Sequence, residues 1–218
     1  QQAFPIESNI FDFLNKYDLD LQKNLVLDSK CGNVQVQQSV GLFRMNRAVQ
    51  YPFFPVVDTF NSKDSVAGII VNKLEQILPL FPSEIKIDTV RSENVLNVST
   101  LFTSSNNSGL MSSNFMLSPD PQQNPFLQLL GQSGKVLSAL SSLKGGGELM
   151  LISDSKFLSD EGGMSIPDNM VFLMNAVDYL ADDEDLISLR SREVTSRPLD
   201  ILQLSDEEEL AISQDDKD

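Results

Sequence analysis

The chain has 218 residues, of which 31 are acidic, 16 are basic and none is histidine, so its formal net charge is −15. This length suits one large domain or two small ones, and a 41% share of apolar residues is enough to bury a core. The negative charge excludes nucleic acid and anionic lipid as expected partners, because both bind Lys and Arg through their phosphate groups.

The chain begins with a predicted helix. Ile10, Leu14 and Tyr17 are spaced as one helix face, and Ser8 or Asn9 is placed to cap its first turn. An α/β unit normally has a strand before such a helix. Because none precedes it here and the first residue is Gln, we expect a piece of a longer protein, with the fold truncated at its N-terminus.

Alternating apolar and polar residues then predict strands. Residues 25–27 form a short apolar strand, and residues 34–49 form a hairpin with one face in water. Residues 51–57 are predicted to be extended, because Pro52 and Pro55 are incompatible with a helix interior. The aromatic residues of this segment either plug the end of a core or line a ligand site.

The middle of the chain changes character twice. A short helix is predicted within residues 61–70, and residues 95–102 carry the β-branched and aromatic residues of a strand. Residues 104–125 are rich in Ser, Asn, Gly, Pro and Gln, and their apolar residues follow no period. They are predicted to form a long loop, either a binding loop or a plain flexible crossover.

The most ordered pattern is a β–α–β unit near the C-terminus. Residues 136–143 before it fit either a helix or an edge strand. Residues 149–152 read as a strand covered on both faces, residues 170–181 as a helix and residues 186–189 as a second strand. The helix is predicted to bury a broad stripe, which leaves a narrow polar edge of Asn175, Asp178 and Asp182. The stripe is formed by Met170, Leu173, Met174, Val177, Leu180 and Ala181 and is widened by Val171, Phe172 and Tyr179. Residues 1–198 are predicted to form one α/β domain, followed by an acidic, disordered tail at 199–218.

Catalytic equipment is sparse. Without histidine the chain cannot build a Ser-His-Asp or Cys-His pair, and most zinc sites are excluded. Cys31 is the single cysteine, so it forms no disulfide within the chain and is expected to be inert. The glycine run 145–147 precedes a strand instead of following one, so it is no P-loop. We therefore expect no enzymatic activity, no metal and no cofactor.

One place still suggests a ligand. In doubly wound sheets, ligands bind beyond the carboxyl ends of the strands. Ser153, Asp154 and Ser155 directly follow the strand at 149–152 and are therefore the candidate ligand-binding residues. The alternative is that they only satisfy backbone groups of a turn, as such residues commonly do.

The residues around this site resemble a known family. Asp154-Ser155, Phe157-Leu158, Asn169, the apolar run 172–180 and Ile187–Arg190 are similar to the C-terminal signature of the auxiliary domain of ABC-type transport systems found in the gliding-motility protein GldG. Where that signature usually has Trp, this chain has Tyr179.

This resemblance implies a Rossmann-like, flavodoxin- or amidotransferase-like sheet, with the hairpin strands added to it. It implies a membrane-anchored parent protein with this part on the extracytoplasmic (periplasmic) side, beside ABC permease and ATPase subunits. Asn169 joins the candidate ligand-binding residues as the asparagine of the signature. The expected function is a non-enzymatic accessory domain that works by binding or as a scaffold, and the alternative is a glycan-binding or carboxylate-dependent glycan-processing module.

Overall fold

The computed structural model describes residues 2–40, 43–88, 90–120, 126–159, 163 and 166–193. It has a mixed α/β fold, in agreement with the predicted class. The elements, in chain order, are α1 (Ile10–Asn15), β1 (Asp20–Leu21), β2 (Leu25–Asp28), β3 (Cys31–Val40), β4 (Phe43–Pro55), β5 (Thr59–Phe60), α2 (Ala67–Ile70), β6 (Ile85–Lys86), β7 (Val95–Thr103), β8 (Ser108–Met111), α3 (Phe126–Leu129), β9 (Val136–Leu143), β10 (Glu148–Ile152), α4 (Pro167–Leu180) and α5 (Glu184–Glu193).

A four-stranded sheet in the order β10-β9-β7-β5 forms the centre of the fold. The sequence of the segment at 136–143 fits either a helix or an edge strand. In the structure it is strand β9, which lies inside the sheet between β10 and β7. The strand at 149–152 is confirmed as β10, but it is the edge strand and its residues are only half-buried, so it is not covered on both faces.

The three pairings of this sheet are antiparallel. A Rossmann-like sheet is built from parallel strands joined by crossover connections. The Rossmann-like part of the prediction is therefore not confirmed, whereas the added antiparallel hairpin is present as β3 and β4.

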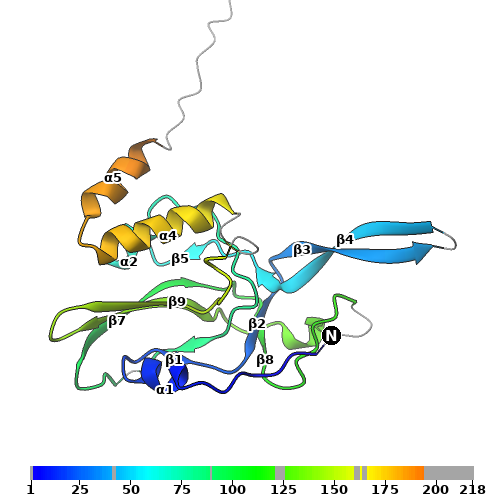
Figure 1. Ribbon diagram of the computed structural model, residues 1–218, viewed down its shortest axis with the longest axis horizontal. Coiled ribbons are helices and arrows are strands. Elements are labelled where there is room, and N and C mark those ends of the chain that lie inside the picture. Colours follow the sequence, from blue (N-terminus) through cyan, green and yellow to red (C-terminus); the bar gives the residue numbers. More distant parts are fainter. Residues whose placement is uncertain are drawn as a thin grey trace, which may run out of the picture.

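Two apolar clusters cover the two faces of this sheet. Figure 1 shows α2 and α4 on one face and α1 with β1 on the other. The first cluster includes Phe172 and Ala176 of α4 packed with Leu137 and Leu140 of β9. The second includes Leu14 of α1 packed with Ala139 of the same strand. The N-terminal helix is thus placed by its buried Leu14, and Ser8 Oγ accepts a hydrogen bond from the Ile10 N–H.

Strand β2 pairs with β8, which lies within the segment predicted to be one long loop. That prediction is wrong for residues 108–111, and residues 121–125 lie outside the described part of the chain. The pairing joins residues about 80 positions apart, so no local sequence pattern reports it. A third apolar cluster beside this pair buries Tyr51 and Phe53 together with Phe126. The aromatic residues of segment 51–57 therefore plug a core.

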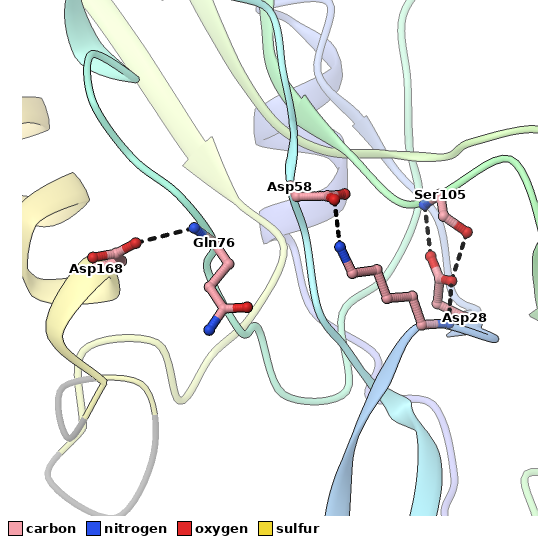
Figure 2. A network of polar contacts seen from close by, with 6 residues as sticks. Asp28, Asp58, Gln76, Ser105 and Asp168 are labelled. Carbon is pink, nitrogen blue, oxygen red and sulfur yellow. Dashed lines mark hydrogen bonds and ion pairs between the residues drawn. The ribbon is translucent and has the colours of Figure 1, made fainter.

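The β3–β4 hairpin is confirmed and projects away from the body of the molecule (Figure 1). We call residues 33–40 and 43–50, which pair with each other, the arm. Figure 2 shows how the base of the hairpin is fixed. Asp28 is fully buried and accepts hydrogen bonds from the backbone N–H and the hydroxyl of Ser105, at 2.6 and 2.7 Å. Lys30 forms an ion pair with Asp58, across the two strands where they leave the body.

Helix α4 is present as predicted, but the face that it buries differs from the predicted one. Its buried residues are Asn169, Phe172, Asn175 and Ala176. Met174, Val177 and Leu180 from the predicted stripe are 44%, 56% and 46% exposed. The stripe prediction is wrong because this helix is apolar nearly all round, so its hydrophobic pattern selects no single face.

The predicted strand at 186–189 is also wrong, because these residues lie in helix α5. Ile187 is buried, whereas Leu186 and Leu189 are exposed. Three apolar residues in four fit a short strand or one turn of a helix equally well, and the surrounding Glu, Ser and Arg residues continue the helix. The tail at 199–218 lies outside the described residues.

Candidate functional site

A cavity of about 390 Å³ opens where β10 ends, and Ser153, Asp154 and Ser155 lie in its wall. The structure thus brings three of the four predicted ligand-binding residues to one cavity. Most of the remaining wall is apolar and is contributed by the N-terminal segment, α1 and the first strands. It includes Phe4, Ile6, Phe11, Leu21, Leu25 and Phe115.

The wall of this cavity also contains polar residues, which are Gln22, Lys23, Asn24, Ser83, Ser153, Asp154 and Ser155. The buried hydroxyl oxygen of Ser153 has no hydrogen-bond partner among the described residues. Lys23 also lines the cavity, where its ammonium forms an ion pair with Glu7 and lies 5.0 Å from the centre of the Phe11 ring. Small-molecule sites commonly combine apolar walls with a few polar groups, at volumes of about 300–1,000 Å³. Chemically, this cavity suits a largely apolar group with a few polar atoms.

Asp154 has a structural role beside the cavity. One carboxylate oxygen accepts a hydrogen bond from the Leu80 N–H at 2.8 Å, and the other accepts one from the Lys156 N–H at 2.7 Å. Burial raises the pKa of Asp154, while the backbone N–H groups of Leu80, Lys156 and Phe157 and the Lys156 charge lower it in part. The alternative that this side chain satisfies backbone groups of a turn therefore describes its hydrogen bonds, although Asp154 also lines the cavity.

Asn169, the fourth predicted residue, does not belong to the cavity wall. It is 1% exposed at the start of α4, and its amide forms two hydrogen bonds with one residue. The side-chain oxygen accepts a hydrogen bond from the Leu78 N–H at 2.9 Å, and the side-chain nitrogen donates one to the Leu78 carbonyl at 3.1 Å. This pairing reproduces the two bonds that a neighbouring β-strand would make to Leu78.

Two further side chains of α4 bind the same stretch of backbone. Asp168 accepts hydrogen bonds from the N–H groups of Glu75 and Gln76, at 3.1 and 3.0 Å (Figure 2). Asn175 donates one to the Ile70 carbonyl at 3.0 Å. The four residues that hold the segment 70–80 through its backbone, which we call the clamp, are Asp154, Asp168, Asn169 and Asn175.

Asp168 and Asn175 were not among the residues that the sequence reasoning selected. The signal for them exists in the sequence, because Asn169, Phe172 and Ala176 also recur at helical spacing. A polar residue on that face has to be hydrogen-bonded when it is buried. The centre of the predicted stripe lies on the opposite face of the helix, so the buried polar residues were not selected.

Burial also shifts the pKa of Cys31 and of Tyr51. Burial raises the pKa of the Cys31 thiol, with a hydrogen bond to the Tyr51 backbone opposing this shift and Asp28 reinforcing it. A raised pKa reduces the thiolate fraction at neutral pH and makes the cysteine less nucleophilic. Burial also raises the pKa of Tyr51 to about 12, and its hydroxyl donates a hydrogen bond to the Leu117 carbonyl at 2.7 Å.

A comparison with known protein families shows to which family this chain belongs. The family described as an ABC-type uncharacterized transport system matches residues 1–176. The chain belongs to this ABC-transport auxiliary family. No match is found among curated proteins or among solved structures.

The match of this ABC-transport auxiliary chain includes both the cavity wall and the clamp. It ends within α4, after Ala176, so α5 lies beyond it. Among the described residues, no helix is long and apolar enough to cross a membrane. Within the same residues, no group of three or more acidic or cysteine side chains is placed to hold a metal ion.

Proposed function

We propose that this chain is a non-enzymatic accessory domain of an ABC-type transport complex, which acts on the extracytoplasmic side by binding. The family supports the transport setting. The resemblance to the gliding-motility protein GldG supports the location and a setting in gliding or export. The single observation that carries the binding role is the largely apolar cavity at the end of β10.

Binding accounts for the polar residues better than catalysis does. The four clamp residues use their side chains on the backbone of segment 70–80. The sequence contains no imidazole for general acid–base work, and the pKa of the single thiol is raised. The wall of the cavity favours an apolar group over a glycan, because sugar hydroxyls need many hydrogen-bonding partners.

The cavity can be tested with the neutral fluorescent probe N-phenyl-1-naphthylamine. The full chain is expected to bind it, and Ser155→Trp should weaken the binding at least about tenfold, because the indole would fill part of the cavity. Ser155 is exposed, so the substitution should leave the core intact. Ser29→Trp is the matched control, because Ser29 is also exposed but does not line the cavity. Equal probe binding by both variants would contradict the proposed site.

The transport setting can be tested in native membranes. A tagged copy of the parent protein, solubilised in mild detergent, should recover an ABC permease and an ATPase, identified by mass spectrometry. The same preparation from cells that express the tag alone is the control. Recovery of neither subunit at native expression levels would rule out the accessory role. Turnover of any substrate by the purified chain would rule out the non-enzymatic part of the proposal.

A further inference from the structure

Helices α4 and α5 expose apolar residues that no described residue covers. Met174, Val177 and Leu180 of α4 are 44–56% exposed, and Leu186 and Leu189 of α5 are 44% and 56% exposed. Adjacent exposed apolar residues on a helix pair indicate an interaction surface, whereas single ones do not. We call these five residues the α4–α5 face.

The surroundings of this face are acidic. Asp182 and Asp183, which lie between the two helices, and Asp185 in the first turn of α5 are exposed. The sequence contains no Lys or Arg between residues 157 and 189. A partner for this face should therefore offer apolar side chains together with positive charge.

The arm has the complementary properties. Its register places Val34 opposite Val49 and Val36 opposite Arg47, so these four side chains share one face of the ribbon. Met45 belongs to the same face and is 59% exposed.

The charge of the arm is opposite to that of the rest of the chain. The sequence has no Asp or Glu from residue 29 to residue 57, although the chain as a whole carries a charge of −15. Arg44 and Arg47 are both exposed. In the described part of the chain, β3 and β4 pair only with each other. A two-stranded ribbon is marginally stable in water without further contacts, so a partner would stabilise the arm.

One chain cannot bring these two surfaces together. Figure 1 shows the arm projecting from one end of the described molecule and α5, with the adjoining end of α4, at the other. Two arms would meet with like positive charge, and two α4–α5 faces with like negative charge, so neither symmetric pairing is favoured. The favoured pairing joins the arm of one copy to the α4–α5 face of another.

We propose that copies of this chain associate head to tail, with the arm of one copy bound to the α4–α5 face of the next. Met45 and Val36 would lie against the exposed apolar residues of α4. Arg47, which shares the face of Met45 and Val36, would lie near Asp182 and Asp183, whereas Arg44 pairs with Ser39 on the other face of the ribbon and adds positive charge to the arm. Such a contact uses two different surfaces, so it closes into a ring or continues as a filament, depending on the rotation between copies.

Charge reversal tests this pairing in the full chain, followed by sedimentation velocity over a concentration series at about 0.15 M salt. The native chain should show a sedimentation coefficient that rises with concentration. Arg44→Glu with Arg47→Glu, or Asp182→Lys with Asp183→Lys, should each weaken association at least about tenfold, because each places like charges at the contact. The variant Lys16→Glu with Lys86→Glu is the control for the arginine variant, because it makes the same charge change at two exposed residues that belong to neither surface.

A mixture of the two reversed variants is the decisive measurement. The acidic arm of the first variant matches the basic face of the second, and the native arm of the second matches the native face of the first. Association should therefore return in the mixture, although each variant alone associates at least about tenfold more weakly than the native chain. Far-ultraviolet circular dichroism confirms that each variant is folded. A native chain that stays monomeric at every concentration, or a mixture that stays dissociated, would overturn the proposal.

Discussion

A Phe172→Ala variant is expected to lose about 3–5 kcal/mol of unfolding free energy, the usual cost of removing a buried phenylalanine. Phe172 is completely buried between α4 and the sheet. Its ring lies 5.3 Å from that of Phe102 and 5.9 Å from that of Phe157, both in edge-to-face contact. A cavity at this point would therefore remove two aromatic contacts as well as apolar burial.

The matched control for this substitution is Val177→Ala on the same helix. Val177 is 56% exposed, so its truncation should change the unfolding free energy by no more than about 0.5 kcal/mol. Guanidinium denaturation at low micromolar concentration measures both variants while keeping association out of the comparison. If Val177→Ala cost as much as Phe172→Ala, the stripe predicted from the sequence would be the buried one after all.

An Asn169→Ala variant is expected to lose about 2–4 kcal/mol, because it leaves both the N–H and the carbonyl of Leu78 without their partners. For a chain of this length, such a loss lowers the melting temperature by roughly 10 °C. The segment 70–80 should also become more accessible to proteases, because it loses one of the four side chains that hold it.

Asn106→Ala is the control, because Asn106 is exposed in a turn and its truncation should be nearly neutral. Thermal unfolding followed by circular dichroism compares the two variants, and limited proteolysis with mass spectrometry locates the first cleavage. A melting temperature for Asn169→Ala equal to that of Asn106→Ala would show that the clamp contributes nothing to stability.

Sequence patterns correctly predicted the elements whose structure depends on residues close together in the chain. The hairpin was predicted from the alternation of apolar and polar residues. The short helix α2 lies within the segment predicted to contain one, and the carboxylate of Asp64 accepts hydrogen bonds from the N–H groups of Val66 and Ala67 at its start. The strand β7 followed from its β-branched and aromatic residues. Ser153, Asp154 and Ser155, selected by a rule for parallel sheets, line a cavity although this sheet is antiparallel, and their role as a ligand site stays a prediction.

The predictions that were wrong concern features that depend on contacts between residues far apart in the sequence. Strand β8 contains Gly and Ser and becomes a strand because β2 pairs with it. Helix α4 is apolar on both sides, so only the sheet beneath it decides that Phe172 turns inward and Val177 outward. The role of Asn169 was missed for the same reason, since its partner Leu78 lies 91 residues away.

The clamp has an evolutionary consequence. Its side chains bind N–H and carbonyl groups, which every residue except proline supplies equally. Residues such as Glu75, Gln76 and Leu80 can therefore be substituted among relatives without loss of these hydrogen bonds, provided that proline does not replace them. The asparagines and aspartates of the clamp have no such freedom. If Asp154 or Asn169 is invariant among relatives of this chain, its role in maintaining the fold is thus a sufficient reason. Invariance alone would not identify either residue as a ligand contact.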